Sequence, residues 1–269
     1  MNDRLNSITP DSSASPAAQA SGEVLLQATE VSRFFGGLKA VEGVSLTLTR
    51  GSLHAVIGTN GAGKSTLINL LSGELPSSAG RVALQGQDVT HWPQPRRARA
   101  GLGRSYQRNT IFQDFSVREN CRLAAQARWP RPWALWEPAS ACRRSGEAAD
   151  QAMARAGLTA VAGRTAGALS HGQKRQLEIA MCLASDPQVL LLDEPLAGMG
   201  AEETERMLAL LDELRPGHAI LLVEHDMDAV FRVADRITVM VNGRVIASDT
   251  PEQVRHNRDV QIAYLGDGH

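Results

Sequence analysis

Residues 53–66 read Leu-His-Ala-Val-Ile-Gly-Thr-Asn-Gly-Ala-Gly-Lys-Ser-Thr, and this stretch decides the fold of the whole chain. Its apolar beginning predicts a strand, and the leucines of 67–71 predict a helix directly behind the glycines. The stretch matches the pattern G-x-x-x-x-G-K-[ST], in which backbone N–H groups turn inward around phosphate oxygens and the helix adds its positive dipole end. The alternative is a glycine-rich turn that only caps a helix, but such a turn requires neither Lys64 nor the hydroxyl of Ser65.

The side chains of this glycine loop (residues 58–66) predict a nucleotide site that includes a metal ion. Lys64 is expected to reach the outer phosphates, and the Ser65 hydroxyl is expected to bind Mg²⁺. The predicted nucleotide-binding residues of the loop are Gly58, Asn60, Gly61, Gly63, Lys64, Ser65 and Thr66.

Two adjacent carboxylates, Asp193 and Glu194, follow the apolar run 189–192, which is typical of a strand buried on both faces. Open α/β sheets bind ligands at the carboxyl ends of their strands. We therefore expect Asp193 to share the Mg²⁺ with Ser65, and Glu194 to orient and deprotonate an attacking water. A solvated acidic turn is the alternative, and the apolar run in front of the pair disfavours it.

Two further polar residues are expected near the γ-phosphate. His225 ends the predicted strand 221–224 in the equivalent place, so its imidazole is expected to contact the γ-phosphate or the attacking water. Gln107, at the start of a predicted insertion, is expected to contact Mg²⁺ or water through its neutral amide.

Composition narrows the class of protein. The chain has 269 residues and a formal net charge of −1, so no overall basic field indicates a nucleic-acid partner. Its three cysteines lack metal-ligand spacing, which favours reduced thiols in packing roles. No apolar run is long enough to span a bilayer, and residues 1–22, rich in Ser, Ala and Pro, are expected to form a disordered tail.

The order of predicted elements indicates an α/β fold. Loose alternation in 24–35 and 40–48, followed by a short strand at 81–84, predicts a partly antiparallel sheet beside the nucleotide site. Alternating strands and helices after residue 169 predict a largely parallel sheet with helices on both faces. The predicted domain, residues 23–266, comprises a β subdomain with the glycine loop (23–90), a helical insertion (91–168), a core with the acid pair (169–242) and a C-terminal hairpin with short helices (243–266).

The insertion contains Trp129, Trp133 and Trp136 among several prolines. These rings could form a platform on which nucleic-acid bases stack, but the basic groove that such a platform needs is short. Aromatic residues in a segment broken by prolines more often cover the loop's own core or contact a protein partner.

The segment 169–173, Leu-Ser-His-Gly-Gln, starts a second important helix. Ser170 and Gln173 have the spacing of a capping box, and apolar residues recur at helical spacing from Leu177 to Ala184. A plain helix cap is the better-supported interpretation of these residues in isolation.

Taken together, these motifs resemble those of the ATP-binding subunits of ABC transporters, over nearly all of residues 24–265. The matching motifs are the Walker A loop at 58–66, the LSGGQ signature at 169–173, the Walker B strand at 189–194, the Q-loop at Gln107, the switch histidine at His225 and the A-loop aromatic that stacks on adenine at Phe35.

The resemblance implies a P-loop NTPase (RecA-like) core with an antiparallel β subdomain and an inserted α-helical subdomain. It implies ATP and Mg²⁺ as cofactors and ATP hydrolysis coupled to transport. It also implies a second ATPase subunit bound head to tail, so that Ser170, Gly172 and Gln173 contact the nucleotide held by that partner. Two integral membrane permeases, and indirectly a periplasmic solute-binding protein, complete the implied complex at the cytoplasmic face of the inner membrane.

The sequence departs from the general family pattern at two positions, which leaves open whether the two shared ATP sites are catalytically equivalent. His171 replaces the first glycine of the signature, and Gly200 stands where many relatives carry an aspartate. The histidine, together with the segments 177–180, 197–199, 224–227 and 263–266, resembles the ATPases of hydrophobic amino acid and amide importers. Branched-chain amino acid import is the centre of that group and urea import a branch of it. The motifs also leave open an exporter ATPase of the lipopolysaccharide-export type and a soluble, non-transport ABC ATPase.

Overall fold

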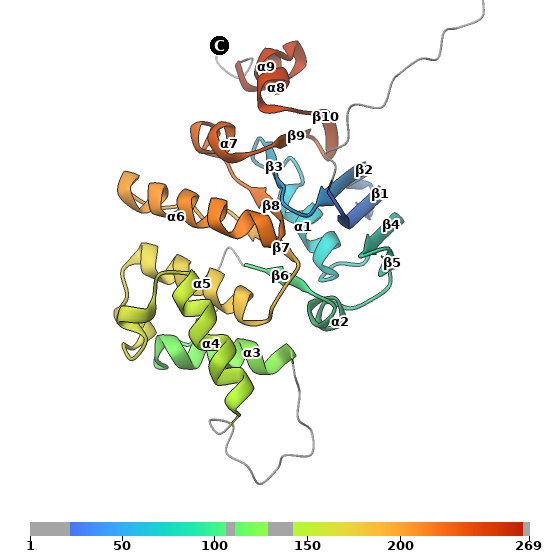
Figure 1. Ribbon diagram of the computed structural model, residues 1–269. Helices are drawn as coiled ribbons and strands as arrows, with labels where there is room; N and C mark the ends of the chain where they lie inside the picture. The colour runs from blue at the N-terminus through green and yellow to red at the C-terminus, as the bar shows by residue number, and fades with distance from the viewer. Residues whose placement is uncertain (1–21, 106–110, 129–141, 266–269) are drawn as a thin grey trace, which may run out of the picture.

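The computed structural model describes residues 22–105, 111–128 and 142–265, and for residues 264 and 265 it describes only the backbone (Figure 1). Several predicted features lie outside these ranges. They are residues 1–21 of the expected tail, Gln107, and the tryptophans Trp129, Trp133 and Trp136.

Strands and helices alternate along most of the described chain. The strands are β1 Val24–Phe35, β2 Leu38–Thr49, β3 Leu53–Gly58, β4 Ala79–Leu84, β5 Gln87–Asp88, β6 Leu102–Arg104, β7 Val189–Asp193, β8 Ala219–Val223, β9 Arg236–Val241 and β10 Arg244–Asp249. The helices are α1 Lys64–Ser72, α2 Gln94–Arg99, α3 Val117–Arg128, α4 Arg143–Arg155, α5 His171–Ala184, α6 Ala201–Leu214, α7 Met227–Val233, α8 Pro251–His256 and α9 Arg258–Leu265.

The larger sheet has six strands in the order β10-β9-β3-β8-β7-β6. Neighbouring strands from β9 to β6 are parallel, and β10 closes the edge as an antiparallel hairpin with β9. The register aligns Val56 of β3 and Asp193 of β7 with Val223 of β8, the strand between them. The carboxyl ends of three adjacent strands therefore meet at one edge of the sheet, as the sequence predicts for a ligand site.

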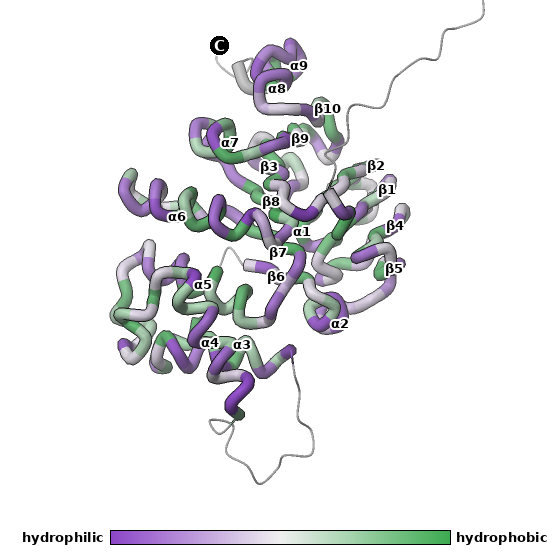
Figure 2. The backbone as a smooth tube through the Cα atoms, viewed as in Figure 1, coloured by the Kyte–Doolittle hydropathy of each residue, from purple (hydrophilic) through white to green (hydrophobic). Residues whose placement is uncertain are grey.

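This sheet separates two hydrophobic cores because successive side chains of a strand point to opposite faces. Leu191 of β7 packs with α1 and the smaller sheet, whereas Leu190 and Leu192 pack with α5, α6 and α7. Every residue of β7 and β8 is buried, as expected of parallel strands covered on both faces. Figure 2 shows hydrophobic residues along β8 and hydrophilic residues along much of α4.

The smaller sheet is antiparallel and has the order β2-β1-β4-β5. Its alternating buried and exposed residues confirm the predicted alternation, and its buried face packs on α1. A Cβ placed on Gly63 would lie 2.4 Å from the carbonyl oxygen of Ala40 in β2. The smaller sheet therefore borders the glycine loop directly.

The helices α3 and α4 pack on each other and on α5 at one end of the molecule, where they share the core below α6 (Figure 1). The expected insertion begins at residue 91, but the structure places β6, residues 102–104, in the larger sheet beside β7. The helical segment therefore starts after Arg104. Three residues carry too little periodicity to be recognised as a strand without their pairing partner.

Three arginines, Arg96, Arg97 and Arg99, precede β6, and the buried one, Arg97, has a structural role. Arg97 is only 2% exposed, and its guanidinium donates hydrogen bonds to the carbonyl oxygens of Leu70 and Leu71 at the end of α1. A further bond reaches the carbonyl oxygen of Thr90. Arg97 therefore satisfies the last carbonyl groups of the helix that follows the glycine loop and does not belong to a basic surface.

Candidate functional site

The glycine loop joins β3 to α1 through a backbone that a side chain would obstruct. Gly63 precedes α1 with φ +99°, a left-handed conformation, and it offers no side-chain cap to the helix. Because glycine has no side chain, Gly63 cannot accept a hydrogen bond from the N–H groups at the start of α1 through a capping side chain. Such N–H groups, at the positive end of the helix, suit a phosphate ligand.

The side chain of Lys64 is hydrogen-bonded to the backbone of the glycine loop. Its side chain is buried, and Nζ donates hydrogen bonds to the carbonyl oxygens of Gly58 at 2.7 Å and Thr59 at 3.1 Å. Burial lowers the pKa of Lys64, while the nearby carboxylates of Glu194 and Asp193 raise it. The predicted phosphate-binding lysine and the predicted acid pair thus lie within electrostatic range of each other.

Asp193 ends β7 in a buried position, 3% exposed, and its Oδ1 atom has no hydrogen-bond partner among the described residues. Burial raises the pKa of its carboxyl group, and the Arg104 guanidinium opposes this shift. Its backbone N–H donates to Oγ of Ser105 at 3.1 Å, which fixes the strand end. A buried carboxylate oxygen that lacks a hydrogen bond suits a hard divalent cation, so the donor chemistry fits Mg²⁺.

Glu194 directly follows β7, and His225 lies two residues after the end of β8, the neighbouring strand of the sheet. Glu194 has φ +51°, unusual for a residue with a side chain, and its N–H donates to the carbonyl oxygen of Val223 at 2.9 Å. The His225 side chain is 63% exposed, and its Nδ1 atom lies 3.7 Å from an oxygen of the buried Glu224. The candidate base is thus only partly exposed, whereas the candidate histidine projects into solvent at the same sheet edge.

Phe35 lies at the end of β1, in register with Leu38 at the start of β2. Its ring is 43% exposed, and the guanidinium of Arg33 lies 4.6 Å from the ring centroid. Because Ala40, two residues further along β2, touches the glycine loop, the exposed ring is near the predicted nucleotide site.

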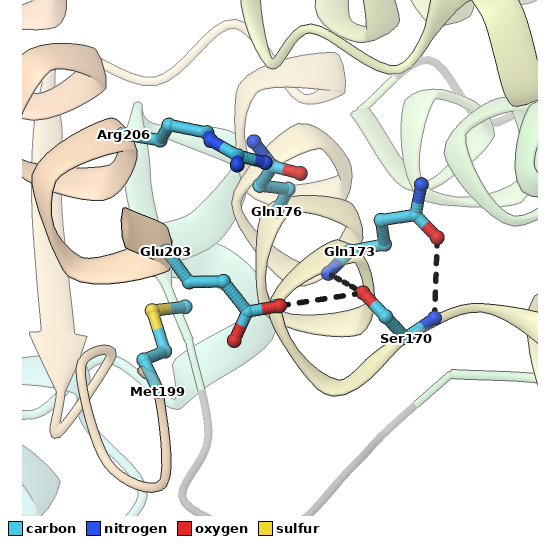
Figure 3. Close-up of a pocket in the computed structure, with 7 residues that line it drawn as sticks. Ser170, Gln173, Gln176, Met199, Glu203 and Arg206 are labelled. Carbon is cyan, nitrogen blue, oxygen red and sulfur yellow. Dashed lines mark hydrogen bonds between the residues drawn. The ribbon is translucent and has the colours of Figure 1, made fainter. Parts of the chain in front are cut away.

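The predicted capping box at the start of α5 is confirmed. Oγ of Ser170 accepts from the Gln173 N–H at 3.2 Å, and the Gln173 side chain accepts from the Ser170 N–H at 3.1 Å. Glu203, near the start of α6, reaches the same helix end, with Oε1 3.5 Å from Oγ of Ser170 (Figure 3). Gly172 allows this approach, because a Cβ there would lie 2.4 Å from that oxygen.

A pocket lies at this helix start, between α5, α6 and the segment before α6. Its lining residues are Ser170, Gly172, Gln173, Gln176, Met199, Glu203 and Arg206 (Figure 3). None of them belongs to the glycine loop. Within the described part of the chain, the pocket at the start of α5 is therefore separate from the glycine loop at the start of α1.

Sequence reasoning missed the residues that hold the site in place. Ser105 binds the backbone of Asp193, and Glu224, which is fully buried, accepts hydrogen bonds from the N–H groups of Leu196 and His225. The sequence held one signal of this role, a charged residue that directly follows a wholly apolar strand. Gln107, the remaining predicted site residue, lies outside the described residues.

The profile of a family described as ABC transporter matches residues 41–197, which include the glycine loop, the α5 cap and the acid pair. The chain belongs to the ABC transporter family. A second profile, described as Branched-chain amino acid ATP-binding cassette transporter, matches residues 244–269 of this ABC protein.

Relatives of this ABC protein carry consistent names. It is 40% identical over 240 residues to the high-affinity branched-chain amino acid transport ATP-binding protein LivG of Escherichia coli K12, covering 87% of this chain and 94% of the relative. It is 37% identical over 250 residues to the corresponding protein BraF of Pseudomonas aeruginosa, covering 90% and 98%. A solved ATP-binding cassette of an ABC transporter in its ADP conformation superposes with a TM-score of 0.79, at 28% identity, covering 90% of this chain and 99% of that one.

These comparisons confirm the predicted family and the ABC ATPase fold. Among the helices of the described ranges, none combines the length and apolar character needed to cross a bilayer.

Proposed function

We propose that this chain hydrolyses ATP to power the import of amino acids, most directly branched-chain amino acids, at the cytoplasmic face of the inner membrane. The hydrolytic part rests on one observation above all, namely that β3, which leads into the glycine loop and Lys64, and β7, which leads into Asp193 and Glu194, both flank β8 and end at the same edge of the sheet. The solute is supported by the names of LivG and BraF and by the profile that matches residues 244–269.

In the proposed site the nucleotide binds along the glycine loop. Backbone N–H groups of residues 58–66 surround the phosphates, Lys64 neutralises the outer ones, and Thr66 adds a hydroxyl. Phe35 stacks on the adenine, which its exposed ring beside the loop allows. Lys64 must exchange its bonds to the Gly58 and Thr59 carbonyl groups for bonds to phosphate.

The proposed chemistry takes place at the carboxyl ends of β7 and β8. Ser65 and Asp193 would hold Mg²⁺, with Gln107 as a further ligand, and the bound ion would supply charge neutralisation on the phosphates. Glu194 orients the attacking water and accepts its proton. His225 stabilises the γ-phosphate, which its exposed position at the edge permits.

The pocket at the start of α5 supports a nucleotide site shared between two copies or two related subunits. Its lining includes no residue of the glycine loop, so one described chain does not unite the two places in a single pocket. In the proposed complex Ser170, Gly172 and Gln173 contact the nucleotide bound by a partner ATPase. The helical segment α3–α4 is proposed to transmit closure to two membrane permeases, which receive solute from a binding protein.

Mixing two inactive variants tests this arrangement. Lys64→Ala removes the phosphate-binding lysine, and Gly172→Asp places a carboxylate at the start of α5, so each homodimer should be inactive. A heterodimer of the two retains one intact shared site. If dimers assort at random, an equal mixture should recover about a quarter of the wild-type ATPase rate.

A matched mixture controls for nonspecific stabilisation. Lys64→Ala mixed with Glu194→Gln should recover nothing, because both changes lie in the half that holds the nucleotide. Equal recovery in both mixtures, or a wild-type rate per subunit that does not depend on protein concentration, would contradict the shared site. Near-normal hydrolysis by Glu194→Gln alone would remove that residue from the role of base.

The solute is tested in the intact complex. A tag on this chain should co-purify membrane subunits and not nucleic acid. After reconstitution with the cognate binding protein, vesicles should accumulate labelled leucine with ATP, and unlabelled valine but not urea should compete. ATP-dependent uptake of urea without leucine would favour the amide branch of the family.

A further inference from the structure

Glu224 is a buried carboxylate that the proposed mechanism does not use. It directly follows β8, its side chain is fully buried, and burial raises the pKa of its carboxyl group. Its two oxygens accept separate backbone hydrogen bonds, Oε1 from the Leu196 N–H at 2.7 Å and Oε2 from the His225 N–H at 3.1 Å. These bonds compensate part of the cost of burying a carboxylate.

Those two N–H groups belong to the two segments that carry the candidate catalytic residues. Leu196 follows Glu194 by two positions, and His225 is itself the second candidate. Glu194 is also tied to the end of β8, because its N–H donates to the carbonyl oxygen of Val223. The turn after β7 is thus held to the end of β8 at two points.

The turn needs this support because Glu194 has a left-handed backbone, with φ +51°. That conformation is strained for a residue with a side chain, and it persists only where surrounding contacts enforce it. The residues of β8 itself are apolar, so packing within the sheet does not call for an acid at position 224. A carboxylate at this position has two oxygens, which accept hydrogen bonds from the N–H groups of Leu196 and His225.

We propose that Glu224 is a positioning residue whose two oxygens hold the backbone of the Glu194 turn and of His225 at a fixed separation, so that both side chains face one phosphate. The proposal rests on the function proposed above. The carboxylate itself touches neither nucleotide nor water in this role. It acts only through the two backbone N–H groups.

Glu224→Gln tests the proposal with almost no change in volume. The amide oxygen can still accept one of the two N–H groups, but the NH₂ group then faces the other donor. We expect kcat to fall about 10- to 100-fold, as small misplacements of catalytic groups do. The KM for ATP should change less than about twofold, because Lys64 and the glycine loop belong to β3 and α1.

A double-mutant cycle separates positioning from a general structural effect. Once the base is removed by Glu194→Gln, adding Glu224→Gln should lower the residual rate by a clearly smaller factor than in the wild type, because only the effect through His225 remains. If Glu224→Gln lowers the rate by the same factor with and without Glu194, its effect is structural and the proposal is wrong. A wild-type kcat for Glu224→Gln would overturn it equally.

Two further variants keep the outcome interpretable. Asp235→Asn is the matched control, because its carboxylate accepts the Leu53 N–H at 2.8 Å at the opposite end of β3, and it should lower stability without lowering kcat. If Glu224→Gln does not fold, Glu224→Asp keeps the charge with a shorter reach and should show the same kcat loss and the same coupling to Glu194. Failure of the proposed base shows separately, as an active Glu194→Gln single variant.

Discussion

His54 offers a quantitative test of how the strand before the glycine loop is built. The imidazole is 3% exposed in β3, and its Nε2 atom lies 2.8 Å from Oγ1 of Thr238 in β9. Burial lowers its pKa from the ordinary 6.5 to about 4, with the backbone hydrogen bond to Thr47 acting in the opposite direction. The folded protein therefore keeps this histidine neutral under conditions in which the unfolded chain protonates it.

The sign and size of the effect follow from these two pKa values. Between pH 6.5 and about 4 the unfolded chain binds more protons at this position, so stability is fully present above pH 6.5 and is lost as the pH falls through about 4. At about 1.4 kcal/mol for each pKa unit, the loss between pH 7.5 and pH 4.5 is about 2.5 kcal/mol.

Urea unfolding of the wild type and of His54→Gln, followed by circular dichroism at several pH values, measures this loss. Glutamine fits the site without titrating, so the stability difference between the two proteins should shrink by about 2.5 kcal/mol from pH 7.5 to pH 4.5. Thr238→Val, which removes the hydrogen bond but keeps the imidazole, should be less stable yet retain most of the pH dependence. A wild-type advantage over His54→Gln that is constant across this range would refute the reasoning.

Two further predictions concern the nucleotide site. Gly63→Ala should abolish ATP binding in calorimetry and lower the melting temperature, because its Cβ would lie 2.4 Å from the Ala40 carbonyl oxygen at φ +99°. Gly61→Ala is its matched control, since φ is +80° but no atom of the described residues outside the neighbouring positions lies within 4 Å of the added Cβ, so the loss of stability should be smaller, about 1 kcal/mol. Ser105→Ala should destabilise the protein by about 1–3 kcal/mol in chemical unfolding, because the buried Asp193 N–H loses its acceptor. An unchanged unfolding midpoint would contradict that role for Ser105.

The parts of the site that are formed by residues close together in the sequence were predictable from the sequence. The glycine loop, the buried run before Asp193 and the capping box of Ser170 and Gln173 each follow from local backbone requirements or from side-chain periodicity. The alternation of strand and helix likewise predicted a parallel sheet with ligands at its carboxyl edge, and the structure has this arrangement. A family resemblance then extended these local patterns to a known fold, and the comparisons confirm that family.

What the sequence by itself determined is which side chains stand at each position of the proposed nucleotide site. Only the tertiary structure decided which strands are neighbours: β8 lies between β3 and β7, and β6 joins the sheet from within the expected insertion. It alone shows that the oxygens of Ser105 and Glu224 hold the backbone beside Asp193, Glu194 and His225. Ser105 is 88 residues from Asp193 in the sequence, and Glu224 is 28 residues from Leu196. No local sequence pattern encodes such contacts, because they form only when distant parts of the chain fold together.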